Sequence, residues 1–135
     1  MQDIESVLRI DEKITGRAHE VYWEGIIANY IDRSPAACLA AEVDGKMVGF
    51  ILGDVRGWEF NIPLSGWIEV LGVDPNYQGR GIGRKLAQLL FDYFRRNNIQ
   101  RVHTMINWND ADLVDYFRSL GFLRGNFIHL EKTLD

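Results

Sequence analysis

A run of glycines and arginines in the middle of the chain has the composition of an anion-binding loop. It spans Gln78, Gly79, Arg80, Gly81, Ile82, Gly83 and Arg84. It follows an expected strand and precedes an expected helix, whose first backbone N–H groups have no partner within the helix. Glycines let the backbone approach a bulky anion and adopt positive φ at little cost. The segment therefore predicts a loop that holds a pyrophosphate; the alternative is a glycine-rich turn that only reverses the chain.

The charge distribution supports a local anion site. The chain carries a net charge of -4, yet residues 79–101 contain six Lys or Arg against one Asp. The remainder of the chain is therefore strongly acidic. An acidic protein does not suit general nucleic-acid binding, which needs a basic surface. The asymmetry indicates one anionic ligand at residues 79–101 and a different, cationic partner elsewhere.

Two common phosphate motifs do not fit this loop. A dinucleotide fingerprint would require a third glycine where Arg84 stands, and a Walker-type loop would require Ser or Thr where Leu86 stands. The segment from Leu71 to Gly83, with Val73-Asp74-Pro75 before the glycines, instead resembles the acetyl-CoA signature of the GNAT superfamily of N-acetyltransferases. A second stretch, from Asn109 to Phe122, is similar to that superfamily's "N … Y-x-x-x-G-F" segment.

The resemblance implies a role for each matching residue. The backbone of Leu71, Gly72 and Val73 would bind the pantetheine arm of acetyl-CoA, and Gln78 through Arg84 would hold its pyrophosphate. Asn109 would hydrogen-bond the arm, and a tyrosine in the following helix would protonate the departing thiolate. The family usually opens with a strand, whereas this sequence starts with a helical pattern. We therefore expect a GNAT-like fold in which the first strand is trimmed or absent.

The second match leaves two residues for the tyrosine position. Counting seven residues from Asn109 gives Tyr116, whereas counting four back from Gly121 gives Phe117. The two side chains point about 100° apart on a helix, so only one can face the thiol. Tyr116 is the candidate acid; the alternative is that it packs in an apolar stripe.

Glu69 is the candidate general base. A lysine-like amine, with a pKa of about 10.4, costs roughly 4 kcal/mol to deprotonate near neutrality, so a positioned base matters for alkylamines. Glu69 precedes Leu71 by two residues, which predicts that the two share a strand face. In polyamine-acetylating and many small-amine relatives, a glutamate occurs at the corresponding place. The alternative is a solvated glutamate at the rim of the sheet.

An acceptor pocket is expected between the first two helices and the loop over residues 56–65. Its aromatic and acidic residues would suit a cation, although they could equally be packing and surface groups: Tyr22, Trp23, Tyr30, Trp58, Phe60, Glu20, Glu24, Asp54 and Glu59. Cys38 lies in an apolar strand pattern and is expected to be inert. No ligand spacing among His and Cys predicts a metal site.

The periodicity predicts an α/β fold (α+β by strict criteria), with a mixed, mostly antiparallel central sheet flanked by helices. Helices are expected over 4–15, 18–30, 82–97 and 110–120, and strands over 37–43, 46–55, 67–73, 101–106 and 127–132. We expect a single domain over 1–135, cytoplasmic because it has no signal peptide, membrane span or cysteine pair. A missing edge strand would leave a sheet margin open to a homodimer.

Together these observations predict an acetyl-CoA-dependent N-acetyltransferase in which an amine attacks the thioester directly in a ternary complex. The acceptor would be a small-molecule, peptide or protein amine, with neither nucleic acid nor membrane as a partner. The alternatives are a non-catalytic acyl-CoA-binding regulatory module and a plain nucleotide-binding protein.

Overall fold

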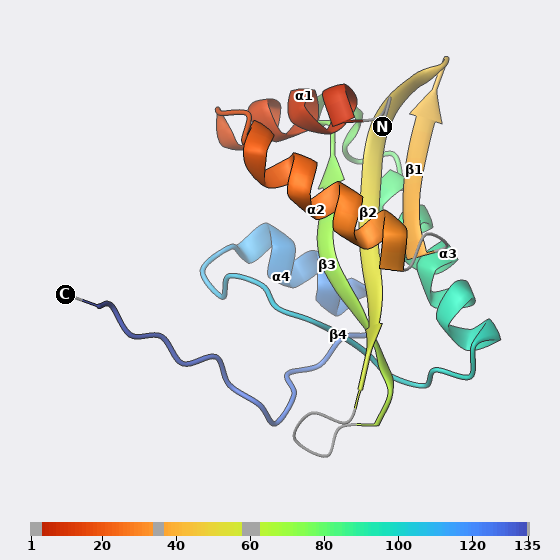
Figure 1. Ribbon diagram of the computed structural model, residues 1–135. Coiled ribbons are helices and arrows are strands. Elements are labelled where there is room, and N and C mark those ends of the chain that lie inside the picture. The colour runs from red at the N-terminus through yellow and green to blue at the C-terminus, as the bar shows by residue number, and fades with distance from the viewer. Residues whose placement is uncertain (1–3, 34–36, 58–62, 135) are drawn as a thin grey trace. The chain divides into compact units, whose positions relative to one another are not determined.

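A computed structural model describes residues 4–33, 37–57 and 63–134, and of 30–33 the backbone alone. The chain forms two compact units, Met1–Met105 and Ile106–Asp135. The second unit contains one helix, α4 (Ala111–Ser119). The elements of the first unit are α1 (Ile4–Thr15), α2 (Glu20–Arg33), β1 (Cys38–Val43), β2 (Lys46–Arg56), β3 (Ser65–Val73), the 3-10 turn η3 (Pro75–Tyr77), α3 (Ile82–Arg96) and β4 (Val102–Thr104) (Figure 1).

The sheet has the strand order β1-β2-β3-β4. β1 pairs with β2, and β2 with β3, in antiparallel fashion, whereas β3 and β4 are parallel. The turn between β1 and β2 holds Asp44 and Gly45 at φ 52° and 78°, as expected for a tight hairpin. The predicted α/β class and mostly antiparallel mixed sheet are confirmed.

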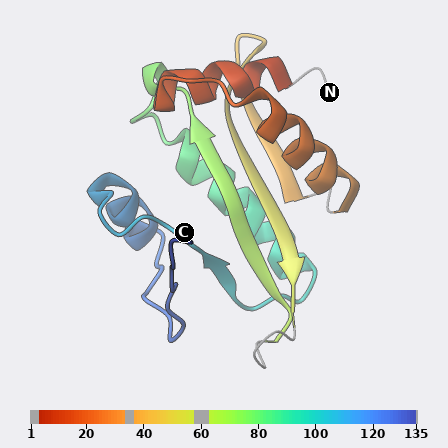
Figure 2. The same cartoon turned by 60° about the vertical axis from the view of Figure 1, so that its left-hand side comes forward.

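The helices cover both faces of the sheet in the first unit (Figure 2): α1 and α2 lie on one face and α3 on the other. On the α1/α2 face the buried core contains Val7, Ile10, Trp23, Phe50 and Leu52, among others. Trp23, which the sequence suggested for the acceptor pocket, is 6% exposed and packs edge-on against Phe50 with ring centroids 5.5 Å apart. Its indole is therefore core rather than pocket wall.

On the opposite face, α3 approaches the sheet closely at a glycine. Leu86, Leu90 and Phe94 of α3 are buried. A Cβ atom at Gly66 would lie 2.5 Å from the Phe94 ring, so a larger residue there would have to displace this buried side chain. The apolar spacing of Leu86, Leu89, Leu90 and Phe94 predicts that all four lie on one packing face, but Leu89 is 42% exposed.

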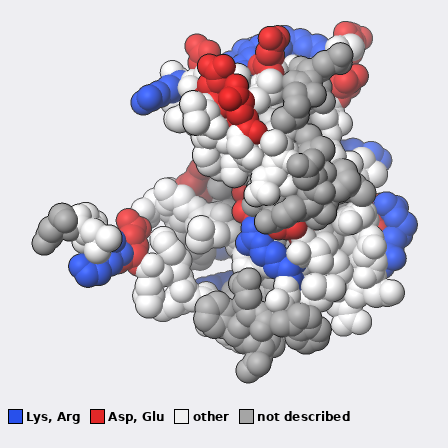
Figure 3. Space-filling view, in the orientation of Figure 1, with Lys and Arg blue, Asp and Glu red and all other residues white. Residues whose placement is uncertain are grey.

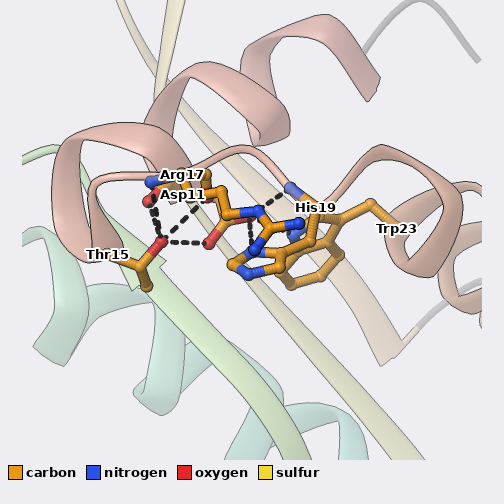
Figure 4. Close-up of polar contacts among 5 residues, drawn as sticks. All are labelled: Asp11, Thr15, Arg17, His19 and Trp23. Atoms are coloured by element: carbon orange, nitrogen blue, oxygen red, sulfur yellow. Dashed lines mark hydrogen bonds and ion pairs between the residues drawn. The ribbon is translucent and has the colours of Figure 1, made fainter.

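A buried carboxylate joins α1 to α2 (Figure 4). Asp11 accepts hydrogen bonds from the Trp23 indole Nε1 at 2.9 Å, the His19 backbone N–H at 2.9 Å and the Thr15 hydroxyl at 3.1 Å, and its Oδ2 lies 2.7 Å from His19 Nδ1. Burial opposes the charge of this carboxyl, but these hydrogen bonds outweigh it and lower the pKa of Asp11. The network fixes the angle at which α2 leaves α1.

A β-bulge in β3 reverses the pattern of its faces. Leu52 of β2 pairs with Val70 and the next residue, Gly53, pairs with Ile68, so Glu69 has no partner across this ladder. Before the bulge Gly66 faces α3, whereas after it Gly72 faces Phe50 and α1. Strand alternation therefore runs in opposite phase on the two sides of Glu69.

In the second unit, the Asp110 side chain caps α4 by accepting a hydrogen bond from Leu113 N at 3.1 Å. The strand expected over 127–132 was wrong, because these residues form no strand pairing. Phe127, Ile128 and Leu130 are 60%, 65% and 82% exposed. Alternation shows that a segment can adopt a strand, but it does not supply the neighbour that a strand must pair with. No helix in the described part of the chain is long and apolar enough to cross a bilayer.

Candidate functional site

The glycine loop leaves open space above the start of α3. Gly79 and Gly81 both have φ 81°, as the sequence predicted for a loop that needs left-handed backbone. A Cβ atom added at either position would meet no described heavy atom within 4 Å. Gly81 is also the N-cap residue of α3 and brings no side-chain cap to its first turn. The loop thus combines room for a bulky anion with the positive end of a helix dipole.

The side chains around the loop shape it further. The Gln78 amide Nε2 donates to the Val73 carbonyl at 3.2 Å, which holds the loop against the end of β3. The Arg80 guanidinium lies 4.9 Å from the centroid of the Tyr77 ring, and its side chain is at the surface. Arg84 and Lys85 are also exposed, in the first turn of α3. These cations can meet an anion that docks on the backbone.

Asp74 anchors the entrance of the loop. Its buried side chain accepts hydrogen bonds from Lys13 Nζ at 2.9 Å and from the Asn76 backbone N–H at 3.0 Å. Its own N–H donates to the Val48 carbonyl at 2.7 Å. Burial opposes ionisation, but the hydrogen bonds and the nearby lysines lower the pKa of Asp74. Asp74 therefore ties the loop to both α1 and β2.

The margin of β3 that faces β4 is paired over only part of its length. The parallel ladder ends at Ile68 and Thr104, where the Thr104 hydroxyl donates to the Ile68 carbonyl at 3.0 Å. Leu71, Gly72 and Val73 pair with β2 on their other side. Within the described residues, no strand covers the second margin of this segment. Its backbone groups could bind an extended ligand arm that leads to the glycine loop.

Glu69 lies at the bulge, beside this margin. Its carboxylate forms an ion pair with Arg56 Nη2 of β2 and is 23% exposed. Arg56 shares a face with Asp54, on the α1/α2 side, whereas Leu71 pairs with Ile51 on the α3 side. The expectation that Glu69 and Leu71 share a face was therefore wrong, because Glu69 is itself the extra residue of the bulge.

A row of side chains across three strands supports the Arg56–Glu69 pair. Asp54, Trp67 and His103 lie opposite one another in the ladders of β2, β3 and β4. The His103 ring stacks on Trp67 with centroids 4.9 Å apart, and the Arg56 guanidinium lies 5.2 Å from the Trp67 ring centroid. Arg56 Nε also lies 3.4 Å from Oδ2 of the buried Asp54. Burial and the neighbouring Arg101 lower the pKa of His103, so its ring is neutral near pH 7.

Two predicted site residues, Asn109 and Tyr116, belong to the second unit. Asn109 is exposed just before α4, and its backbone N–H donates to Asn107 Oδ1 at 2.9 Å. Phe117 is 4% exposed and packs edge-on against Phe122 with centroids 5.1 Å apart. Tyr116 is half-buried beside it. Of the two residues that the sequence left open, Phe117 is the more deeply buried, and Tyr116 packs edge-on against it with ring centroids 5.0 Å apart.

The other residues considered from the sequence are Cys38, possible metal ligands and the aromatic and acidic residues suggested for the acceptor pocket. Burial and the negative charge of Asp54 raise the pKa of the Cys38 thiol, which agrees with an inert cysteine. Tyr22 is 54% exposed on α2. Among the described residues no cluster of three or more His, Cys, Asp or Glu could hold a metal. The suggested pocket residues Trp58, Glu59 and Phe60 lie outside the described residues, as does the side chain of Tyr30.

Sequence reasoning missed Arg56, His103 and Lys13 as parts of the site. Arg56 alternates with Asp54 on one strand face, and this spacing was the available signal. The ladder partners of His103 and the ion pair of Lys13 with Asp74, 61 residues away, depend on tertiary structure and leave no local pattern.

Comparison with known proteins places this chain in a family. The family model described as Acetyltransferase (GNAT) family matches residues 4–122. The chain belongs to the GNAT family. An N-alpha-acetyltransferase RimI from Mycobacterium tuberculosis is 38% identical over 90 residues, which cover 64% of this chain and 51% of the relative. An L-2,4-diaminobutyric acid acetyltransferase from Nocardia farcinica is 30% identical over 101 residues, covering 75% of this chain and 51% of the relative.

The structural comparison supports the GNAT fold. The crystal structure of PH1933 from Pyrococcus horikoshii OT3 superposes with a TM-score of 0.82 at 19% identity, covering 95% of this chain and 85% of that one. The GNAT chain described here spans about half the length of each of the two relatives named above.

Proposed function

We propose that this chain is an acetyl-CoA-dependent N-acetyltransferase that moves the acetyl group directly to an amine in a ternary complex. One observation carries the proposal: an open glycine loop at the start of α3 follows a β3 segment whose second margin has no strand partner among the described residues. Membership of the GNAT family and the acetyltransferase names of the relatives support it.

Acetyl-CoA fits this arrangement as the donor substrate. Residues Gln78 to Arg84 would hold its pyrophosphate through backbone N–H groups and the exposed arginines. The backbone of Leu71, Gly72 and Val73 would bind the pantetheine arm in the manner of an added strand. An N–H group of the same segment would donate to the thioester oxygen and stabilise the charge that develops there during acyl transfer.

Glu69 would accept the proton from the acceptor ammonium, directly or through a water molecule. The neutral nitrogen then attacks the carbonyl carbon, and the carbon–sulfur bond breaks as the tetrahedral intermediate collapses. Tyr116 would give its proton to the departing thiolate, and the second proton that the nitrogen loses as the amide forms would restore the tyrosine through solvent. Asn109 would hydrogen-bond the cofactor arm. The products are the acetylated amine and CoA.

The acceptor we propose is a cationic amine, either a small molecule or a peptide or protein amine. The ion cluster of Asp54, Arg56 and Glu69 carries a net negative charge beside the aromatic Trp67. Acidic side chains also lie over α1 and the start of α2 (Figure 3), where Glu12, Glu20 and Glu24 are exposed among basic side chains. These carboxylates can attract a cation. We further propose a single cytoplasmic domain over 1–135, able to form a homodimer and independent of nucleic acid and membrane.

A thiol-release assay tests the proposal. The protein is mixed with acetyl-CoA and a panel of amines that includes short peptides with free α-amino groups, alkyl diamines and amino acids. We expect release of CoA that depends on one class of amine. Saturable acetyl-CoA binding with no release for any amine would instead identify a non-catalytic binding module, and stronger stabilisation by ATP or NAD than by CoA would overturn the donor assignment.

Glu69→Gln tests the base. We expect kcat/KM to fall about 100-fold, the lower end of what general-base catalysis contributes. The matched control is Asp92→Asn, which removes an exposed carboxylate that is paired with Arg95 on α3. If Glu69→Gln keeps both the rate and the pH profile of the unchanged protein, Glu69 is not the base.

A further inference from the structure

The environment of Glu69 differs from that of a solvated strand glutamate. Its carboxylate is paired with a guanidinium that is itself fixed on two other sides. Asp54, which is 4% exposed, holds Arg56 Nε, and the Trp67 ring lies under the guanidinium at 5.2 Å. Arg56 cannot shift freely because a planar guanidinium that is both stacked and paired has few alternative positions.

The platform beneath Arg56 is rigid for the same reason. Trp67 is held between Arg56 and the His103 ring, and His103 belongs to the short parallel ladder with β3. The arginine therefore presents Nη2 to Glu69 from a fixed position. Glu69 needs this help because a bulge residue lacks the ladder partner that would otherwise restrain its backbone.

We propose that Arg56 is the positioning residue for the general base: it orients the Glu69 carboxylate toward the acceptor nitrogen. The inference rests on the proposed acetyl-transfer function. Arg56 does not touch the reacting atoms in this scheme, and its effect passes entirely through Glu69. Because a neighbouring cation favours the charged form of a carboxylate, the pH profile of a variant without Arg56 reports on the pair as well as the rate does.

Among the described residues, the other charged groups near Glu69 do not replace this effect. On β2 Asp54 is an anion, and on β4 His103 is neutral near pH 7. Of the α1 groups, Asp11 is engaged by His19 and Trp23, and Lys13 is paired with Asp74 at the far end of β3. The α2 glutamates Glu20 and Glu24 are exposed, and α3 covers the opposite face of the sheet.

The experiment compares Arg56→Gln and Arg56→Lys with the unchanged protein, using the amine that gives turnover. For Arg56→Gln we expect the acidic limb of the kcat/KM profile to move to higher pH by about one unit. This is the lower end of the shift that an adjacent arginine causes in a carboxylate, because Arg56 is partly exposed. We also expect kcat to fall about tenfold while the KM for acetyl-CoA stays constant. Arg56→Lys keeps the positive charge but loses the planar guanidinium that lies over the Trp67 ring. It should therefore return the acidic limb to its original pH but recover only part of kcat.

Two controls separate positioning from structural damage. Arg95→Gln removes an exposed arginine that is also paired with a carboxylate, Asp92, and should leave the profile unchanged. In the Glu69→Gln background, Arg56→Gln should add less than a twofold loss, since both changes act through one carboxylate.

The outcomes distinguish the two proposals. If the unchanged protein releases CoA and the Arg56→Gln profile superimposes on it, the role of Arg56 is refuted and the acetyltransferase function stands. The role of Arg56 is refuted in the same way if the losses from Arg56→Gln and Glu69→Gln simply multiply. If the unchanged protein releases no CoA with any amine, the proposed function fails first and the positioning role fails with it.

Discussion

Replacing Lys13 by Met should destabilise the protein by leaving a buried anion without its cation. The Asp74 side chain is fully buried, and after the change its hydrogen bond from Asn76 N–H remains. Removing one partner of a buried pair costs about 3–5 kcal/mol. The Lys13 side chain is 32% exposed, and Lys46 lies near enough to add positive charge. Because this pair is only partly buried, we expect the free energy of unfolding to fall by about 2–3 kcal/mol, which is less than for a fully buried pair.

The second half of the cycle uses Asp74→Asn. Asparagine keeps the shape and can still accept from Asn76 N–H, while Lys13 can turn to solvent. The expected loss is about 1–2 kcal/mol. In the double variant no unpaired charge is buried, so its loss should be smaller than the sum of the single losses by about 1–3 kcal/mol. Urea unfolding followed by the fluorescence of the four tryptophans measures each value.

The pH dependence of the same pair gives an independent check. The pKa of Asp74 is lowered in the folded state, so its contribution is complete above the unfolded value of about 3.9 and is lost as pH falls through the folded value. The cost of Lys13→Met should therefore be constant from pH 7 to about pH 5 and shrink in more acidic buffer. Additive single losses, or a Lys13→Met cost below about 0.5 kcal/mol at pH 7, would refute this reasoning.

Two further changes test the loop and the helix junction. Gly81→Ala places a Cβ at φ 81° in open space, so it should cost about 1–2 kcal/mol of stability and weaken acetyl-CoA binding measured by calorimetry. The control is Gly16→Ala, at φ 85° and equally open, which should cost the same stability without affecting binding. Equal binding by both variants would contradict the proposed loop. Trp23→Phe removes one of the hydrogen bonds to Asp11 and should lower the free energy of unfolding by about 1.5–3 kcal/mol. The control is Tyr22→Phe, at an exposed position of α2. Equal losses for the two variants would show that the indole N–H contributes nothing.

The helices and most strands followed from the sequence because their signals are local. The apolar stripe of α3, the Asp44-Gly45 turn and the left-handed glycines at 79 and 81 each depend on neighbours within a few residues. The strand predicted over 127–132 failed for the opposite reason. Its alternation is genuine, but pairing is a property of two segments, and the pattern of one cannot reveal whether the other is present.

The candidate site also has one part that the sequence predicts and one part that it does not. The glycine loop could be predicted because backbone conformation and charge are encoded where they act. The surroundings of Glu69 could not, since its bulge is defined by the register with β2 and its ion pair by a residue 13 positions earlier in the chain. Strand periodicity assumes an unbroken ladder, so a single extra residue gave the wrong face.

The reversal at Glu69 also bears on attempts to change which amine this protein accepts. A mutant library that randomises every second position of β3, chosen by reading along the chain, would combine Trp67, which supports Arg56, with Leu71, which points toward the layer of α3. Variants changed on the α3 side could lose packing against that helix, and their loss of function would be mistaken for altered selectivity. A library on β3 is better chosen by strand face, with the change of phase at Glu69 taken into account, and should leave Asp54, Trp67 and His103 unchanged.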